Sequence, residues 1–202
     1  MFERIKNIIV APKNEWGVIE SENTSHSKLF VKYVLPLSLI PAVSSFIGYG
    51  FFKQLLFGRF ASFSLFTSLS WGIGHAVVQW VSLVLAIYLA AMIINLLADS
   101  FGAKKDFDKA FSLVAFAYTP MFIGGVFYIF PFLSFLAMIM GIYGLYLLYV
   151  GMQPMMKAPD DKNTIYFVVS LVVMLVVTGV IMAIMTSIMT AILFSGLFYH
   201  VF

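Results

Sequence analysis

Cysteine is absent from this chain of 202 residues, and charged residues make up only 10% of it. Without cysteine the protein can form no disulfide, no thiolate nucleophile and no zinc site built on thiolates. A soluble domain carries about 25% charged residues. With 62% hydrophobic residues and a mean hydropathy of +1.00, this chain cannot cover its surface with polar groups. The composition therefore predicts an integral membrane protein, with lipid as its main solvent.

The chain also lacks the motifs of a catalytic apparatus. HExxH, GxSxG and Walker sequences are absent. Ionisable side chains within spans mark functional sites, and the long apolar runs contain almost none. We therefore expect a protein that is not an enzyme and has no cofactor. The formal net charge of +3 is too small to predict nucleic-acid binding.

Apolar runs separated by short charged segments predict an all-α polytopic bundle of five transmembrane helices. We expect spans at about residues 29–52, 74–97, 110–130, 132–152 and 164–195, because each run can cross about 30 Å of hydrocarbon. Pro36 and Pro41 interrupt the first run and predict a kink or an irregular turn. Residues 110–152 carry no charge and are too long for one span, so Pro131 is the expected hairpin turn.

Two segments stand apart from these five spans. Residues 1–28 are predicted to be a cytoplasmic amphipathic segment ahead of the transmembrane domain, residues 29–202. Residues 60–71 (FASFSLFTSLSW) are rich in serine and phenylalanine. We expect them to form an interfacial or re-entrant piece, because Gly72 and Gly74 favour a break before the second span.

The distribution of basic residues predicts the orientation. Five spans place the two ends of the chain on opposite sides of the membrane. With the N-terminus inside, the inside segments hold ten basic residues: Arg4, Lys6, Lys13, Lys28, Lys32, Lys104, Lys105, Lys109, Lys157 and Lys162. The outside segments hold only Lys53 and Arg59. This bias follows the positive-inside rule and predicts a cytoplasmic N-terminus.

Three stretches of the chain carry the pattern of a known family. They are IIVAPKNEWGVIESE with Pro12, Trp16 and Glu20, SFGAKKDFDKAFSLVAFAYTP with Phe101, Gly102, Phe107, Ala110, Tyr118 and Pro120, and GIYGLYLLYVGM with Gly141, Tyr143, Gly144, Tyr146 and Gly151. In this order they resemble bacterial, short-form members of the Yip (Rab/Ypt-interacting protein) family. The resemblance implies a five-helix membrane domain with a cytoplasmic N-terminus. The short N-terminal segment implies a bacterial inner-membrane protein and argues against Rab binding.

Two pairs of residues in the spans are candidates for a polar functional site. Asn95 and Asp99 lie one helical turn apart at the cytoplasmic end of the second span, where Asp99 could pair with a lysine or attract a cation. A solvated helix end is the alternative. Tyr118 and Pro120 lie in the third span, where proline frees a backbone carbonyl that a tyrosine hydroxyl could satisfy. This kinked helix suits either a structural role or a transport pathway.

Aromatic and histidine residues supply two further candidates. Tyr143 and Tyr146, with Tyr149, recur every three residues in the fourth span. They could line a polar cavity or a lipid-headgroup groove, or make hydrogen bonds between helices. His75 and His200 are far apart in the sequence, which is a poor signal for a metal site, so we expect no metal.

The N-terminal segment has an amphipathic pattern. Phe2, Ile5, Ile8 and Ile9 share one helical face. This pattern predicts either a helix on the inner membrane surface or a helix packed under its own bundle. Trp16 is expected to anchor the segment at headgroup depth.

Small residues recur every four positions in the fifth span. They are Gly179, Ala183, Ser187, Ala191 and Ser195. Such a stripe predicts a helix-packing face, either within the chain or between copies in a homo-oligomer.

Two functional hypotheses follow. The first is a non-enzymatic Yip-like membrane protein that organises the membrane or recruits partners through its cytoplasmic face; its partners would be membrane lipids, a cytoplasmic protein and a second copy of the chain. The alternative is a small transporter, channel or lipid-translocating protein that uses the broken spans. A continuous polar groove would favour the alternative, and a tightly packed bundle would favour the first hypothesis.

Overall fold

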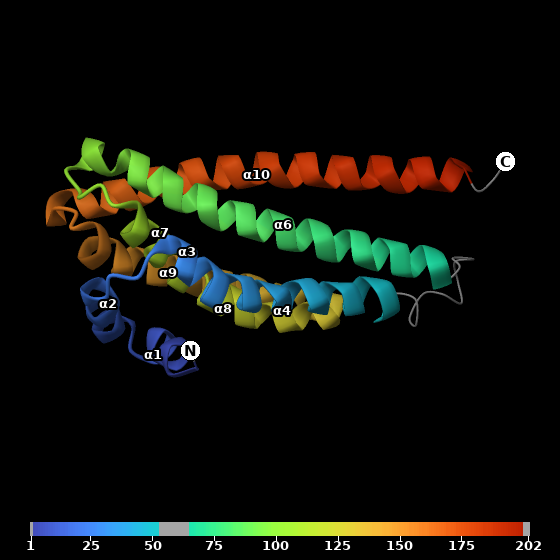
Figure 1. Cartoon of the computed structure of the whole chain (residues 1–202), viewed down its shortest axis with the longest axis horizontal. Helices are drawn as coiled ribbons and strands as arrows, with labels where there is room; N and C mark the ends of the chain where they lie inside the picture. Colours follow the sequence, from blue (N-terminus) through green and yellow to red (C-terminus); the bar gives the residue numbers. More distant parts are fainter. Residues whose placement is uncertain (1, 53–64, 200–202) are drawn as a thin grey trace.

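The computed structural model describes residues 2–52 and 65–199, without the side chains of residues 65–68 and 192–199 (Figure 1). All regular elements in these ranges are helices, which confirms the all-α prediction. Figure 1 shows the long helices running along one axis, with the N-terminal helices and the loops 102–106 and 157–159 gathered at one end. We call this end the polar end.

Five helical segments are long and apolar enough to cross a membrane, as the sequence predicted. They are His26–Phe52, Leu69–Phe101, Phe107–Ile129, Pro131–Met156 and Asp160–Ala191. Two short helices precede them, α1 (Phe2–Val10) and α2 (Pro12–Ser21). The chain is therefore a multi-pass membrane protein with a helical N-terminal segment.

The first span is irregular ahead of Pro36, as predicted, whereas the helix continues without a break through Pro41. It consists of α3 (His26–Leu29), a π-helical turn η1 (Phe30–Val34), α4 (Leu35–Phe46) and a second π-helical turn η2 (Ile47–Phe52). Pro36 has no N–H, and its ring would clash with a carbonyl of the preceding turn in a regular helix. The wider turn η1 directly before α4 relieves this clash.

The second span corrects one prediction. Helix α6 (Leu65–Leu97) runs without interruption through Gly72 and Gly74, so Leu65–Trp71 is continuous with the second span and the predicted break before that span is wrong. The remaining residues of that prediction, 60–64, lie outside the described residues. Gly72 serves close packing instead of a break, since a Cβ there would lie 2.6 Å from the Gly50 Cα.

The third and fourth spans form the predicted hairpin. The third consists of α7 (Phe107–Ala117), α8 (Thr119–Gly124) and the 3₁₀ turn η4 (Gly125–Ile129). The backbone is extended at Phe130, and the 3₁₀ turn η5 (Pro131–Leu133) leads into α9 (Ser134–Met156). Pro131 is therefore at the turn between the two spans. The fifth span belongs to α10 (Asp160–Tyr199).

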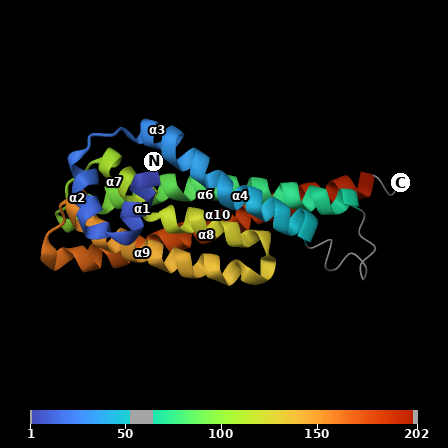
Figure 2. The same cartoon turned by 90° about the horizontal axis from the view of Figure 1, so that it is seen from below.

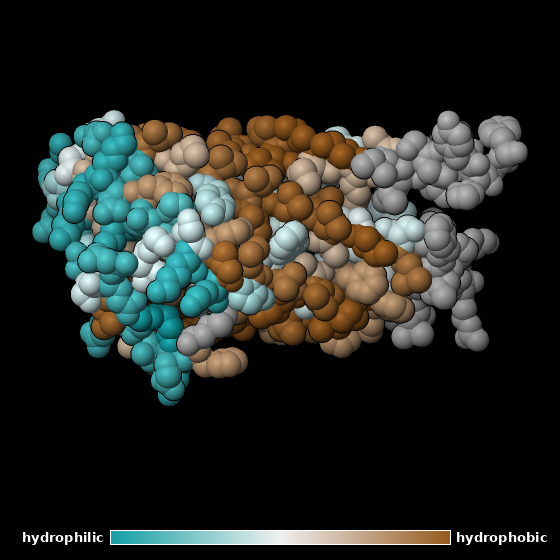
Figure 3. All heavy atoms as spheres, in the orientation of Figure 1, coloured by the Kyte–Doolittle hydropathy of each residue, from teal (hydrophilic) through white to brown (hydrophobic). Residues whose placement is uncertain are grey.

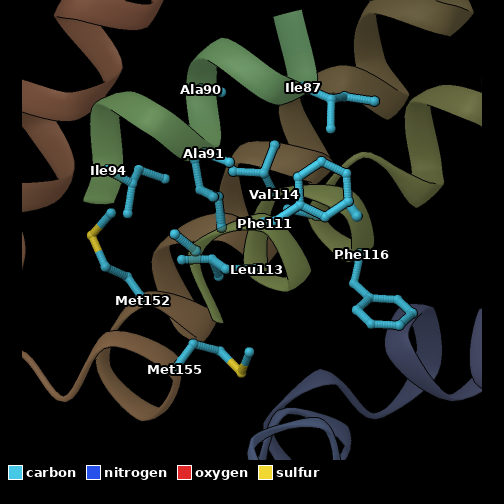
Figure 4. Close-up of a cluster of buried hydrophobic side chains, with 14 of the residues drawn as sticks. Ile87, Ala90, Ala91, Ile94, Phe111, Leu113, Val114, Phe116, Met152 and Met155 are labelled. Atoms are coloured by element: carbon cyan, nitrogen blue, oxygen red, sulfur yellow. The ribbon is translucent and has the colours of Figure 1, made fainter. Parts of the chain in front are cut away.

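The core is centred on the third span. In its most hydrophobic window 72% of the residues are buried, against 11% for the fifth span. Figure 4 shows how α7 meets α6 and α9 there. The labelled residues are Phe111, Leu113, Val114 and Phe116 of α7, Ile87, Ala90, Ala91 and Ile94 of α6, and Met152 and Met155 of α9. Small alanines on α6 let the large side chains of α7 pack closely.

Charge and hydropathy divide the molecule along its axis. Figure 3 shows hydrophilic residues at the polar end and a hydrophobic belt over the rest of the described face. All nine acidic residues of the sequence and ten of its twelve basic residues lie at this end. They belong to α1, α2, the loop 22–25, α3, η1, the 3₁₀ turn η3 (Ala98–Phe101), the loops 102–106 and 157–159, and the first turns of α7 and α10. The protein thus has one strongly charged end.

Candidate functional site

The candidate site is the polar end, and its main element is an N-terminal cap formed by α1 and α2. The cap lies against the ends of α8 and α9 (Figure 2). Three residues of the cap itself are buried on its inner face, Ile8, Trp16 and Ile19. The structure therefore has the inner face of this segment packed on its own bundle.

Trp16 corrects a prediction, because it is not a headgroup anchor. Its side chain is 0% exposed and meets the Phe116 ring edge to face, with 6.5 Å between the ring centroids. The ring lies on Gly151 of α9, where a side chain would leave no room for it. The large apolar area of the indole favours this burial, and the Trp16 Nε1 has no hydrogen-bond partner among the described residues.

A charge cluster fixes the two helices of the cap to each other. Arg4 donates from Nη1 to the Glu15 carboxylate at 2.6 Å and from Nη2 to Glu22. The Glu15 side chain is only 9% exposed, and the Arg4 guanidinium carbon lies 6.0 Å from the centroid of the Phe116 ring. A carboxylate this buried is tolerated only with a charged partner.

Two lysines connect the cap to the bundle. Lys109 of α7 donates to the main-chain carbonyls of Glu20 and Glu22, at 2.9 Å for Glu22. Lys157, which follows α9, forms an ion pair with the Glu20 carboxylate at 3.0 Å. This contact with Lys157 holds the pKa of the Glu20 carboxyl below its ordinary value of 4.5.

The entry to the first span is tied to the third. The His26 main-chain N–H and the His26 ring Nδ1 both lie 2.7 Å from the same Asp108 carboxylate oxygen. Asp108 is in the first turn of α7, where the helix dipole favours an acidic residue, and Asp106 caps that helix by accepting from the Lys109 N–H at 3.1 Å. Sequence reasoning missed His26, although its place ahead of an apolar run was visible.

A buried hydroxyl pair lies at the break between α7 and α8. Tyr33 Oη and Thr119 Oγ1 are 2.7 Å apart, and both residues are buried. The sequence indicated Tyr118 for a polar role beside Pro120, but the Tyr118 ring packs near Phe122 with centroids 6.4 Å apart. The hydrogen bond between helices at this kink is therefore formed by Tyr33 and Thr119, and not by Tyr118.

Asn95 and Asp99 do not form one site. Asp99 is exposed and pairs with Lys105 at 3.3 Å, as expected for a solvated helix end. The Asn95 Oδ1 is buried and has no hydrogen-bond partner among the described residues. At the residue before Asn95, the Ile94 carbonyl accepts a hydrogen bond from the Tyr166 hydroxyl.

The tyrosines of α9 make hydrogen bonds between elements. The Tyr143 hydroxyl donates to the Ile9 carbonyl of α1 at 2.6 Å, and Tyr149 Oη lies 3.2 Å from Thr164 Oγ1 of α10. The Tyr146 ring packs beside Tyr143, with centroids 5.6 Å apart, and is 44% exposed. Tyr143 therefore helps to hold the cap, which agrees with the interhelical interpretation.

The small-residue stripe of α10 is not covered by the chain itself. Gly179, Ala183, Ser187 and Ala191 are exposed, and a Cβ at Gly179 would meet nothing within 4 Å. The side chain of Ser195 lies outside the described residues. A packing face within the described chain is therefore wrong for these four residues, and a face between copies stays a prediction.

His75 and a groove near it complete the candidates. The His75 ring stacks on Tyr49 with centroids 4.1 Å apart, and no metal-binding cluster occurs among the described residues; His200 lies outside them. A groove of about 380 Å³ lies between α4 and α6, lined by apolar side chains that include Leu39, Phe46 and Trp80. Its lining gives a polar solute nothing to bind.

Comparison with known proteins adds one match. The family model for the Yip1 domain matches residues 6–182, from α1 into α10. No curated protein and no solved structure matches the chain.

Proposed function

Because the chain belongs to the Yip1 domain family, we propose that it is a non-enzymatic membrane protein that organises the membrane or recruits protein partners through its polar end. The observation that carries this proposal is the concentration of charge on one end of an otherwise apolar bundle. Exposed charged side chains on a rigid support are suited to recognition. The cap, residues 98–109 and residues 153–163 would form the recognition surface.

The proposed working face is cytoplasmic, and the proposed location is the bacterial inner membrane. Ten basic residues at the polar end support this orientation through the positive-inside rule. The five apolar spans and the Yip1 domain family support residence in a membrane.

The transporter alternative receives less support. Transport of a polar solute needs a pathway lined by polar groups. The groove between α4 and α6 is lined by apolar side chains, and the third span is closely packed. The polar residues proposed for a pathway are also separated, since the Asp99 side chain is exposed at the end of its span and the Asn95 Oδ1 is buried.

Reconstitution into liposomes tests the two hypotheses. We expect no flux of fluorescent lipids or small ions above that of empty vesicles. Flux that falls in Asn95→Ala, Asp99→Asn or Tyr146→Phe would favour the transporter and contradict the proposal. A photocrosslinker placed in cells at Lys104, on the polar end, should give protein adducts. The control position is Ile142, which is 59% exposed in the hydrophobic belt and should give none.

A further inference from the structure

Ion pairs at the polar end involve most of the acidic residues of the N-terminal segment but leave four of its lysines without a partner among the described residues. Glu15, Glu20, Glu22, Asp99 and Asp108 each contact a basic side chain. In the segment from α1 to η1, Glu3 is the one acidic residue outside these pairs. The same segment carries four exposed lysines that form no ion pair among the described residues: Lys6, Lys13, Lys28 and Lys32. The free charge of this segment is therefore basic.

One of these lysines lies between exposed apolar side chains of α1, and two others lie at the start of the first span. Lys6 is midway between Phe2 and Val10 on one face of α1, and these two residues are 86% and 74% exposed. Lys28 and Lys32 are one turn apart at the start of the first span. Figures 1 and 3 share one orientation and show α1 where the hydrophilic surface gives way to the hydrophobic belt. We call Lys6, Lys28 and Lys32 the basic collar.

We propose that the basic collar binds the headgroups of anionic phospholipids, while Phe2 and Val10 insert among the acyl chains. This inference rests on the proposed function and names its lipid partner. Lysines near the membrane surface attract anionic lipids, and apolar side chains on the same helix insert at the interface. Phe2 and Val10 stand exposed at the border of the hydrophobic belt, and this position favours a lipid surface over an acidic protein partner.

Lipid selectivity measures the charge part of the proposal. The full-length protein is reconstituted in phosphatidylcholine vesicles that contain spin-labelled phosphatidylglycerol or spin-labelled phosphatidylcholine. We expect the protein to immobilise the anionic label preferentially, and this preference to fall at least about fivefold in the Lys6→Gln/Lys28→Gln/Lys32→Gln variant. The matched control is Lys13→Gln/Lys104→Gln/Lys162→Gln, which removes three exposed lysines outside the collar, on α2, the loop 102–106 and the start of α10, and should keep the preference.

Depth measurement tests the insertion part. The chain has no cysteine, so a spin label at Val10→Cys is specific. We expect this label to be more accessible to oxygen than to a water-soluble relaxation agent, and the reverse for Asn14→Cys on α2. Equal accessibility at the two sites would overturn the insertion.

Three further outcomes would overturn the lipid proposal. They are no anionic preference in the wild type, an unchanged preference in the collar variant, and an equal loss in the control. Loss of protein adducts at Lys104 in the collar variant, with lipid preference intact, would assign the lysines to a protein partner. Adducts at Lys104 with no lipid preference would leave the proposed function standing and remove this inference alone.

Discussion

Trp16 of α2 packs on Gly151 of α9 at a distance that leaves no room for a side chain at residue 151. A Cβ there would lie 2.6 Å from the Trp16 Cζ2 and 2.7 Å from the Leu113 Cδ1. Because Trp16 is fully buried, this contact makes the N-terminal cap part of the bundle core.

Substitution of Gly151 should therefore loosen the cap. We expect Gly151→Ala to destabilise the protein by about 1–3 kcal/mol, because an overpacked core must shift the indole. The control is Gly17→Ala in the same cap, since a Cβ at Gly17 meets nothing within 4 Å; it should be neutral or stabilising by up to about 1 kcal/mol. Hydrogen exchange of residues 2–21 and the thermal midpoint are the measurements. Equal effects of the two substitutions would contradict the packing argument.

The bond from Tyr143 to the Ile9 carbonyl predicts a second effect. Tyr143→Phe should cost about 0.5–1.5 kcal/mol and speed hydrogen exchange in α1, because the carbonyl loses its donor. Tyr146→Phe is the matched control, since that residue is more exposed and lies beside the same ring. A faster exchange in the control than in Tyr143→Phe would show that the hydroxyl does not hold the cap.

The Tyr33–Thr119 pair should behave as a coupled unit. Tyr33→Phe or Thr119→Val each leaves a buried hydroxyl without its partner, which costs about 1–3 kcal/mol. The double variant should cost less than the sum of the two single variants, because both polar groups are then removed. Unfolding in detergent, followed for the four proteins of the cycle, measures the coupling. Strict additivity would contradict a direct bond.

Acid should weaken the link between the cap and α9. Lys157 lowers the pKa of Glu20 in the folded protein, so the stabilisation is present above pH 4.5 and is lost as the pH falls through the folded-state pKa. The wild type should thus lose thermal stability over this range more steeply than Glu20→Gln. In a Lys157→Gln background, the pH profiles of thermal stability should no longer differ between Glu20 and Glu20→Gln. Parallel pH profiles for the wild type and Glu20→Gln would contradict the prediction.

The exposed stripe of α10 predicts contact between copies. Oxidation of Ser187→Cys in membranes should give a covalent dimer, because small residues allow close approach of two helices. Met182→Cys, on another face of the same helix, should give much less. Absence of a dimer at residue 187 would contradict the predicted contact between copies.

The sequence predicted the features that depend on local composition. Five apolar runs, the irregular first span at Pro36 and the turn at Pro131 follow from hydropathy and from the missing proline N–H, and all three are present. The family resemblance is likewise confirmed by the match over residues 6–182. These features need no knowledge of which helices are neighbours.

Features that depend on tertiary contacts were not predictable. From the sequence alone, Gly72 predicts a break in the helix. Only the close approach of Gly50 shows that Gly72 allows two helical segments to pack together. From the sequence alone, Trp16 is a typical interfacial anchor, and only its contact with Gly151 in the folded chain shows that it is a core residue. Tyr33 and Thr119 are 86 residues apart, so no local pattern joins them.

Orientation is the most direct test of the claim that the polar end is the working face in the cytoplasm. The variant Asn14→Cys carries a single exposed cysteine on α2 in a chain that has none. We expect a membrane-impermeant maleimide to label it in inverted inner-membrane vesicles and not in intact spheroplasts. Labelling in intact spheroplasts would place the polar end outside the cytoplasm and contradict the account.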